Sequence, residues 1–204
     1  FEKFLSFPTN PSEEVAKRLK GRKVGKYQCD SITLPVDFEE SVAILSNTLE
    51  KGSYDLALSL GLAYSREVIS LERVALNLID DGVRKDNKGR IIEDKQILSE
   101  GVNAYFASLP LKKIHLALNE AGLKSELSLS AGSYVCNLVM YHLLHFQNTI
   151  SPSMLAGFIH IPPDASLKRE SKWTLDQLEE AIHIVINNII IKILYEEKFF
   201  KLST

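Results

Sequence analysis

Cys136 is the residue of this sequence best placed to act as a nucleophile. It follows the segment SAGSYV at 130–135 and opens the apolar stretch 137–146. This pattern predicts a turn followed by a helix, and the positive end of a helix dipole favours a thiolate over a thiol. The same pattern also fits a small buried cysteine that only packs in the core. The residues around Cys136 therefore leave a catalytic and a structural role open.

A cysteine nucleophile needs a base, and the base needs a group that orients it. His160 lies near the end of the apolar segment 155–161, directly before two prolines, so we expect it at the carboxyl end of a strand. Glu72 interrupts the apolar segment 69–79, where a carboxylate costs free energy unless it has a partner. An exposed face of that segment is the alternative explanation for Glu72.

The remaining histidines and cysteines do not form a metal-binding pattern. His142 and His145 are three residues apart on the expected helix after Cys136, outside any zinc motif, and His115 and His183 fall among helical apolar positions. Two cysteines in the chain, at 29 and 136, are too few for a disulfide framework. We expect no metal, no organic cofactor, and a reducing compartment, which is the cytoplasm.

The elements that must position these residues alternate between strands and helices. Segments rich in Val, Ile and Leu predict strands at 27–34, 55–60, 68–79, 127–129 and 155–161. Helical spacing of apolar residues, with Asn10 and Thr174 as N-caps, predicts helices at 11–21, 38–49, 111–122, from about 136 to 146, and from about 175 onward. This order predicts an α/β fold, a single-domain α/β/α sandwich over residues 1–204 with a largely parallel twisted sheet.

Composition excludes several classes of protein. The 204 residues carry 24 Lys and Arg against 26 Asp and Glu, a formal net charge of −2, which lacks the basic excess of a nucleic-acid binder. The most apolar stretch, 182–194, is interrupted by polar residues and is too short for a membrane span. No basic segment followed by an apolar one opens the sequence, so no secretory signal is expected.

Four segments of the chain resemble the pyroglutamyl peptidase I (pyrrolidone-carboxyl peptidase) family. Three of them contain the candidate catalytic residues: GSYVCN at 132–137, ISLERVALN at 69–77 and GFIHIP at 157–162. The fourth, FEKF at 1–4 followed by NPS at 10–12, is similar to the family's N-terminal loop. The order of acid, cysteine and histidine also agrees, and the resemblance covers nearly the whole chain.

The resemblance implies a cysteine exopeptidase that removes an N-terminal pyroglutamate from peptides through a thioester. Cys136 would be the nucleophile, His160 the base and then the acid for the leaving amine, and Glu72 the group that orients the imidazole. The backbone N–H of Cys136 would stabilise the oxyanion. The resemblance also implies a homo-oligomer, a tetramer, with no nucleic-acid or membrane partner.

The resemblance further assigns the residues that hold the substrate. Phe1 and Phe4 would form aromatic walls around the pyroglutamyl ring, with Tyr134 and Val135 on the side of the nucleophile. Loop anchoring and core packing are the alternative roles of these four residues. A pocket without a carboxylate partner would exclude an ordinary N-terminus, whose ammonium ion would lose its hydration unpaired.

The sequence departs from the family at several positions. Lys3 and the pair at 5–6 replace a proline and two glycines of the N-terminal loop, and Leu62 replaces a frequent glutamine. One inserted residue displaces an arginine near the oxyanion, for which Arg84 could substitute. A relative that binds without hydrolysis is therefore the alternative function. Because Phe1 stands where the family already has a preceding strand, we also expect residues upstream of it.

Overall fold

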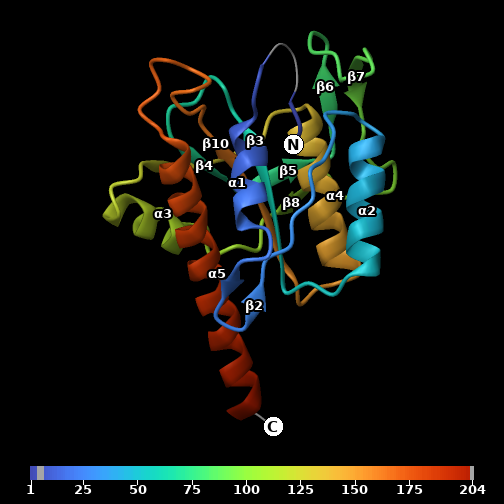
Figure 1. Cartoon of the computed structure of the whole chain (residues 1–204). Coiled ribbons are helices and arrows are strands. Elements are labelled where there is room, and N and C mark those ends of the chain that lie inside the picture. The colour runs from blue at the N-terminus through green and yellow to red at the C-terminus, as the bar shows by residue number, and fades with distance from the viewer. Residues whose placement is uncertain (4–6, 203–204) are drawn as a thin grey trace.

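The fold is built on a four-stranded sheet with helices on both faces, in a computed structural model that describes residues 1–3 and 7–202, with side chains described up to residue 196 (Figure 1). The strand order is β3-β10-β4-β9, with the bounds β3 Leu56–Leu62, β10 Leu155–Ile161, β4 Ile69–Glu72 and β9 Ser125–Ser128. β3 is parallel to β10 and β4 is parallel to β9, whereas β10 and β4 are antiparallel. The sheet is therefore mixed and largely parallel.

Two layers of helices cover the sheet, which confirms the α/β/α sandwich (Figure 1). One layer contains α1 (Pro11–Leu19), α3 (Leu111–Glu120) and α5 (Leu175–Leu202), and the other contains α2 (Glu40–Lys51) and α4 (Val135–Thr149). Alternation along β10 serves both layers: Ile159 and Ile161 pack with the first, and Ala156 and Phe158 with the second. Within the described part of the chain, no helix combines the length and apolar character that crossing a membrane requires.

The predicted helix starts are confirmed in their capping residues. The Asn10 side chain accepts a hydrogen bond from the backbone N–H of Ser12, 3.0 Å away, at the start of α1. At the start of α5, Thr174 Oγ1 accepts from the Gln177 backbone N–H at 3.2 Å, and the Gln177 side chain accepts from the Thr174 backbone N–H at 3.0 Å. This reciprocal pair is a capping box.

Two predicted strands differ from the structure. The segment 27–34 contributes only β2 (Tyr27–Gln28), which forms a short hairpin with β1 (Lys23–Val24) around Gly25 at φ 59°. The segment 68–79 is divided among β4, β5 (Val74–Leu76) and the start of β6 (Ile79–Asp81). β5 and β6 leave the central sheet to pair with β8 (Ala104–Phe106) and β7 (Ile92–Lys95), respectively. Apolar runs predict extended backbone, but distant pairing partners decide where each strand ends.

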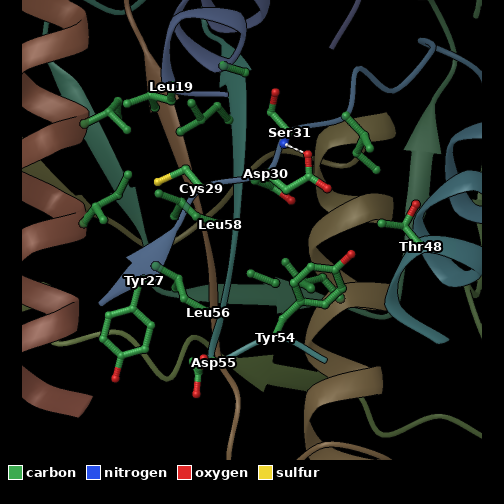
Figure 2. A pocket seen from close by; sticks show the side chains of 18 of the residues that line it. Leu19, Tyr27, Cys29, Asp30, Ser31, Thr48, Tyr54, Asp55, Leu56 and Leu58 are labelled. Carbon is green, nitrogen blue, oxygen red and sulfur yellow. Dashed lines mark hydrogen bonds between the residues drawn. The ribbon is translucent and has the colours of Figure 1, made fainter. Parts of the chain in front are cut away.

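A groove of about 490 Å³ runs along the edge of β3 that faces away from β10 (Figure 2). The groove is lined by Leu56 and Leu58 of β3, Tyr27 of β2, Cys29 directly after β2, and Leu19 of α1, together with residues of α2 and α5. None of the three predicted catalytic residues lines this groove. The candidate site is therefore found elsewhere, over β4 and β10.

Candidate active site

Two adjacent antiparallel strands position Glu72 and His160. In the register of β4 and β10, Glu72 lies opposite Phe158 and Ser70 lies opposite His160. Because side chains alternate along a strand, Glu72, Phe158 and His160 point to the face covered by α4. His160 Nδ1 lies 2.8 Å from Glu72 Oε1, and both residues are buried, with exposed fractions of 5% and 0%. The sheet itself thus builds a buried histidine–carboxylate pair.

The first turn of α4 brings Cys136 to the other side of the imidazole. Cys136 is the second residue of α4, is half-buried and is not in a disulfide. It lies close enough to His160 for its charge to raise the pKa of the imidazole. Because the N–H groups of the first helical turn have no partner within the helix, the Cys136 amide is a donor beside the sulfur. The three predicted catalytic residues therefore lie together in the order Cys136, His160, Glu72.

The charge on His160 depends on its two neighbours. Burial alone would lower the pKa of the imidazole, since it penalises the cation. The negative charge of a Cys136 thiolate, the hydrogen bond to it, and the Glu72 carboxylate outweigh that effect and raise the pKa of His160 to about 9. Beside a Cys136 thiolate, His160 is therefore a cation, which is the state that a thiolate–imidazolium pair requires.

The loop that precedes α4 is held to the rest of the fold at several points. Asn137, 1% exposed, accepts a hydrogen bond from the Leu76 backbone N–H and donates to the carbonyl oxygens of Leu76 and Leu78, each at 2.9 Å. Ser133 donates its hydroxyl to the Asp80 carbonyl oxygen at 2.5 Å. These bonds fix the start of α4, and with it the sulfur of Cys136, against the β5–β6 connection.

Sequence reasoning missed Arg66, which completes the surroundings of Glu72. Arg66 lies between β3 and β4, and its Nη1 donates to Glu72 Oε1 at 2.6 Å. Its Nη2 donates to the Ser130 carbonyl oxygen, 3.0 Å away, in the loop before α4. A buried carboxylate needs a nearby cation, and this requirement could have pointed to Arg66. Arg73, which directly follows Glu72 in the sequence, meets the same requirement, so the sequence does not distinguish the two arginines.

Phe158 and Gly61 were also missed, although they shape the space beside the imidazole. The rings of Phe158 and His160 have centroids 4.8 Å apart, and the Phe1 ring lies 6.2 Å from that of Phe158. Gly61 pairs with His160 across β3 and β10. A methyl group at Gly61 would lie 2.7 Å from Phe158 Cζ and 3.1 Å from His160 Cδ2. The glycine leaves room for both rings.

The predicted substrate-binding residues lie mostly in the core. Tyr134 and Val135 are 5% and 1% exposed, and the Tyr134 ring packs edge-on against Phe38 with centroids 5.4 Å apart. Phe1 is half-buried and packs against the core on the α4 side of the sheet. Phe4 lies outside the described residues. Of the three that the structure describes, Phe1 is linked to His160 through Phe158.

Arg84, the candidate cation for the oxyanion, forms an ion pair with Asp81 at the end of β6. Its Nε donates to Asp81 Oδ2 at 2.6 Å, and its guanidinium lies 4.7 Å from the centre of the Tyr134 ring. Burial alone would raise the pKa of the Asp81 carboxyl. The hydrogen bonds and the charge of Arg84 outweigh that effect, so the pKa lies below its usual value. The positive charge of Arg84 is thus paired with Asp81.

The other four histidines have partners away from Cys136. His115 lies 2.9 Å from the Ser125 hydroxyl, and His145 lies 2.9 Å from the Tyr105 hydroxyl. Burial and the neighbouring His145 lower the pKa of His142 to about 4, and His183 lies beside Arg22. Among the residues that the structure describes, no group of three or more His, Cys, Asp or Glu side chains is arranged to hold a metal ion.

The family model described as pyroglutamyl peptidase matches residues 1–192. This chain belongs to the pyroglutamyl peptidase family. The pyrrolidone-carboxylate peptidase of Pyrococcus furiosus is 44% identical to it over 162 residues, which cover 79% of this chain and 77% of that protein. The enzyme of the same name from Halalkalibacterium halodurans is 37% identical over 194 residues, covering 93% and 96% of the two chains. The resemblance inferred from the four segments is confirmed.

Solved structures of this family share the fold. The structure of pyrrolidone carboxyl peptidase from Pyrococcus furiosus and its cysteine-free mutant matches this chain with a TM-score of 0.91 and 36% identity. The match covers 95% of this chain and 96% of that one. A mutant of the same peptidase also gives a TM-score of 0.91, at 94% and 96% coverage. The α/β architecture deduced from the sequence is therefore that of a pyroglutamyl peptidase.

Proposed function

We propose that this protein is a cysteine peptidase that hydrolyses an N-terminal pyroglutamyl residue from peptides, with residues 1–204 acting as one domain. The observation that carries the proposal is that the buried pair Glu72–His160 lies beside Cys136, on a chain that belongs to the pyroglutamyl peptidase family. Each of these three groups has the chemistry that acyl transfer requires.

Acylation begins with the Cys136 sulfur. As a thiolate paired with the His160 cation, it attacks the carbonyl carbon of the pyroglutamyl residue and forms a tetrahedral oxyanion. The backbone N–H of Cys136 is placed to donate to this oxyanion, because it lies in the first turn of α4. As the intermediate collapses, the C–N bond breaks, His160 gives its proton to the leaving amine, and a thioester remains on the sulfur.

Deacylation reverses the proton transfer. Neutral His160 removes a proton from a water molecule, the resulting hydroxide attacks the thioester, and the C–S bond breaks to release pyroglutamate and the thiolate. Throughout, Glu72 accepts the hydrogen bond from Nδ1, so that Nε2 faces the sulfur and the imidazolium is stabilised. Both half-reactions use the same three side chains.

Specificity follows from charge. The pyroglutamyl lactam is neutral, whereas an ordinary N-terminus would bring an ammonium ion whose unpaired burial costs several kcal/mol. The carboxylate of Glu72 is already held by Arg66 and His160, so it does not pair with such an ammonium. Phe1 forms a wall for the ring, and Tyr134 and Val135 back the pocket on the side of the nucleophile; the family resemblance assigns a second wall to Phe4, which lies outside the described residues. Packing of Phe1 on Phe158, next to His160, supports this arrangement.

The proposal is tested with a fluorogenic pyroglutamyl amide and the matching prolyl amide, which lacks the lactam carbonyl and carries a charged ring nitrogen. The pyroglutamyl compound should release its fluorophore and the prolyl compound should not. Cys136→Ala should lower kcat at least about a thousandfold. Absence of turnover by the folded protein would overturn the proposal, and lactam binding without hydrolysis would instead favour a binding relative.

We propose also that the protein works as a homo-oligomer in the cytoplasm. Two cysteines without a disulfide fit a reducing compartment. Exposed apolar side chains on α5, with Ile191 63% and Leu194 38% exposed, support contact between copies. Light scattering of the purified protein tests this: a tetramer is the expected mass, and a monomer at micromolar concentration would contradict it.

A further inference from the structure

The carboxylate of Glu72 is completely buried, although only one of its two oxygens has hydrogen-bond partners. Its side chain has no exposed surface, and one oxygen, Oε1, accepts from both Arg66 and His160. Among the residues that the structure describes, the other oxygen, Oε2, has no hydrogen-bond partner. An ion in such a place is stable only with a close opposite charge, because desolvation otherwise favours the protonated acid.

Two cations lie against that carboxylate, and only one of them is permanent. His160 loses its charge when it donates its proton to the leaving amine, whereas an arginine stays protonated at any pH the enzyme meets. Arg66 Nη1 is 2.6 Å from Oε1, and its side chain is 26% exposed, so the guanidinium reaches the carboxylate from the surface of the site. Arg66 is therefore the cation that remains when His160 is neutral.

Arg66 also connects the acid to the loop that leads to the nucleophile. Its Nη2 donates to the Ser130 carbonyl oxygen at 3.0 Å, in the loop between β9 and α4. A planar guanidinium can hold two acceptors in fixed directions, which a lysine ammonium does less well. One side chain thus fixes Glu72 on β4 and the approach of the loop before Cys136.

The other ionisable groups near Glu72 set the local charge balance. His160 on β10 interacts electrostatically with Cys136 on α4 and with Glu72, and Arg66 lies beside Glu72. On β9, Glu126 lies on the same face, and its carboxylate accepts from the Ser70 hydroxyl at 2.7 Å. Removing Arg66 would leave an excess of negative charge around the imidazole, and the cluster would take up a proton at higher pH.

We propose that Arg66 is a positioning residue that holds the Glu72 carboxylate toward His160, and that its permanent positive charge sets the acid limit of the Cys136–His160 pair. The inference rests on the proposed function for its kinetic readout. Arg66 lies outside the three residues proposed to perform the chemistry. Its charge acts on Glu72, and its two hydrogen bonds hold Glu72 and Ser130 together.

The test compares Arg66→Gln with Arg66→Lys over a range of pH. Arg66→Gln should move the acid limb of kcat/KM upward by about one pH unit or more, because a carboxylate loses its close cation. Arg66→Lys keeps the charge and should leave that limb in place, with kcat lowered because Glu72 and Ser130 are no longer held together. Arg73→Gln is the matched control, since Arg73 follows Glu72 but lines a separate hollow with Phe106; it should keep the wild-type profile.

A second measurement needs no turnover. The rate of Cys136 alkylation by iodoacetamide is followed at each pH by peptide mass, which separates it from alkylation of Cys29. The acid limb of this alkylation profile should shift in the same way as that of kcat/KM. Because alkylation needs no turnover, the inference about Arg66 can fail while the peptidase activity stands, and it can hold if that activity is absent. An unmoved limb in folded Arg66→Gln would overturn it. If that variant does not fold, a limb that moves in Arg66→Lys would overturn it.

Discussion

Gly61→Ala crowds the His160 imidazole while it leaves the three proposed catalytic side chains unchanged. The new methyl carbon would lie 2.7 Å from Phe158 Cζ and 3.1 Å from His160 Cδ2. Carbon atoms in contact are about 3.5–4.0 Å apart, so one or both rings must move by roughly 0.7–1 Å. Phe158 is fully buried and its ring lies 4.8 Å from that of His160, so its displacement is passed on to the imidazole.

The size of the effect follows from that displacement. A misplacement of about 1 Å at a reacting group can lower a rate about 100-fold, so kcat should fall by about 10- to 100-fold. Overpacking a buried site should also lower the free energy of unfolding by about 1–3 kcal/mol. The assay measures kcat on the pyroglutamyl amide well below the melting temperature, together with urea unfolding.

Gly157→Ala is the matched control on the next strand. Its methyl carbon would lie 2.5 Å from Leu109 Cδ1, a comparable overlap on the opposite face of the sheet. It should lower the free energy of unfolding similarly and leave kcat near the wild-type value. The reasoning is refuted if Gly61→Ala loses stability but keeps its kcat, or if Gly157→Ala loses as much kcat.

Substitutions at three further positions test the surroundings. Glu72→Gln removes a charge that raises the pKa of His160, so the alkaline limb of kcat/KM, expected near pH 9 where His160 loses its proton, should move to lower pH; an unmoved limb would contradict this. Asn10→Ala removes the N-cap of α1 and should cost about 1 kcal/mol of unfolding free energy in urea, while Asn10→Ser should cost less. Asn137→Ala removes the hydrogen bonds of a buried side chain to the backbone N–H and carbonyl oxygen of Leu76 and should cost about 1–3 kcal/mol, measured by the same unfolding; a loss below about 1 kcal/mol would show that water replaces the side chain.

The elements that the sequence predicts best are those whose signal is local. β10 is a continuous apolar run buried on both faces, and the predicted segment 155–161 matches it residue for residue. The start of α4 was placed within one residue of its first position, Val135. Since Cys136 and His160 lie at the ends of these elements, their positions in the fold followed from the sequence.

The direction of β4 did not follow from the sequence. Glu72 and His160 meet because β4 is antiparallel to β10, and an apolar segment carries no information about which neighbour it will pair with. Arg66 was missed for the same reason: its two acceptors, Glu72 and Ser130, meet only after β4, β9 and the loop before α4 have come together. The residues of the site could be predicted from their local sequence, whereas the contacts between them depend on segments that are far apart in the sequence.

The antiparallel pairing of β4 with β10 also affects when the sulfur can become reactive. Glu72 and His160 are 88 positions apart, and β10 is the last strand to leave the ribosome. A growing chain that already contains Cys136 still lacks the cation that activates it. The nucleophile therefore acquires its partner only after β10 has paired with β4.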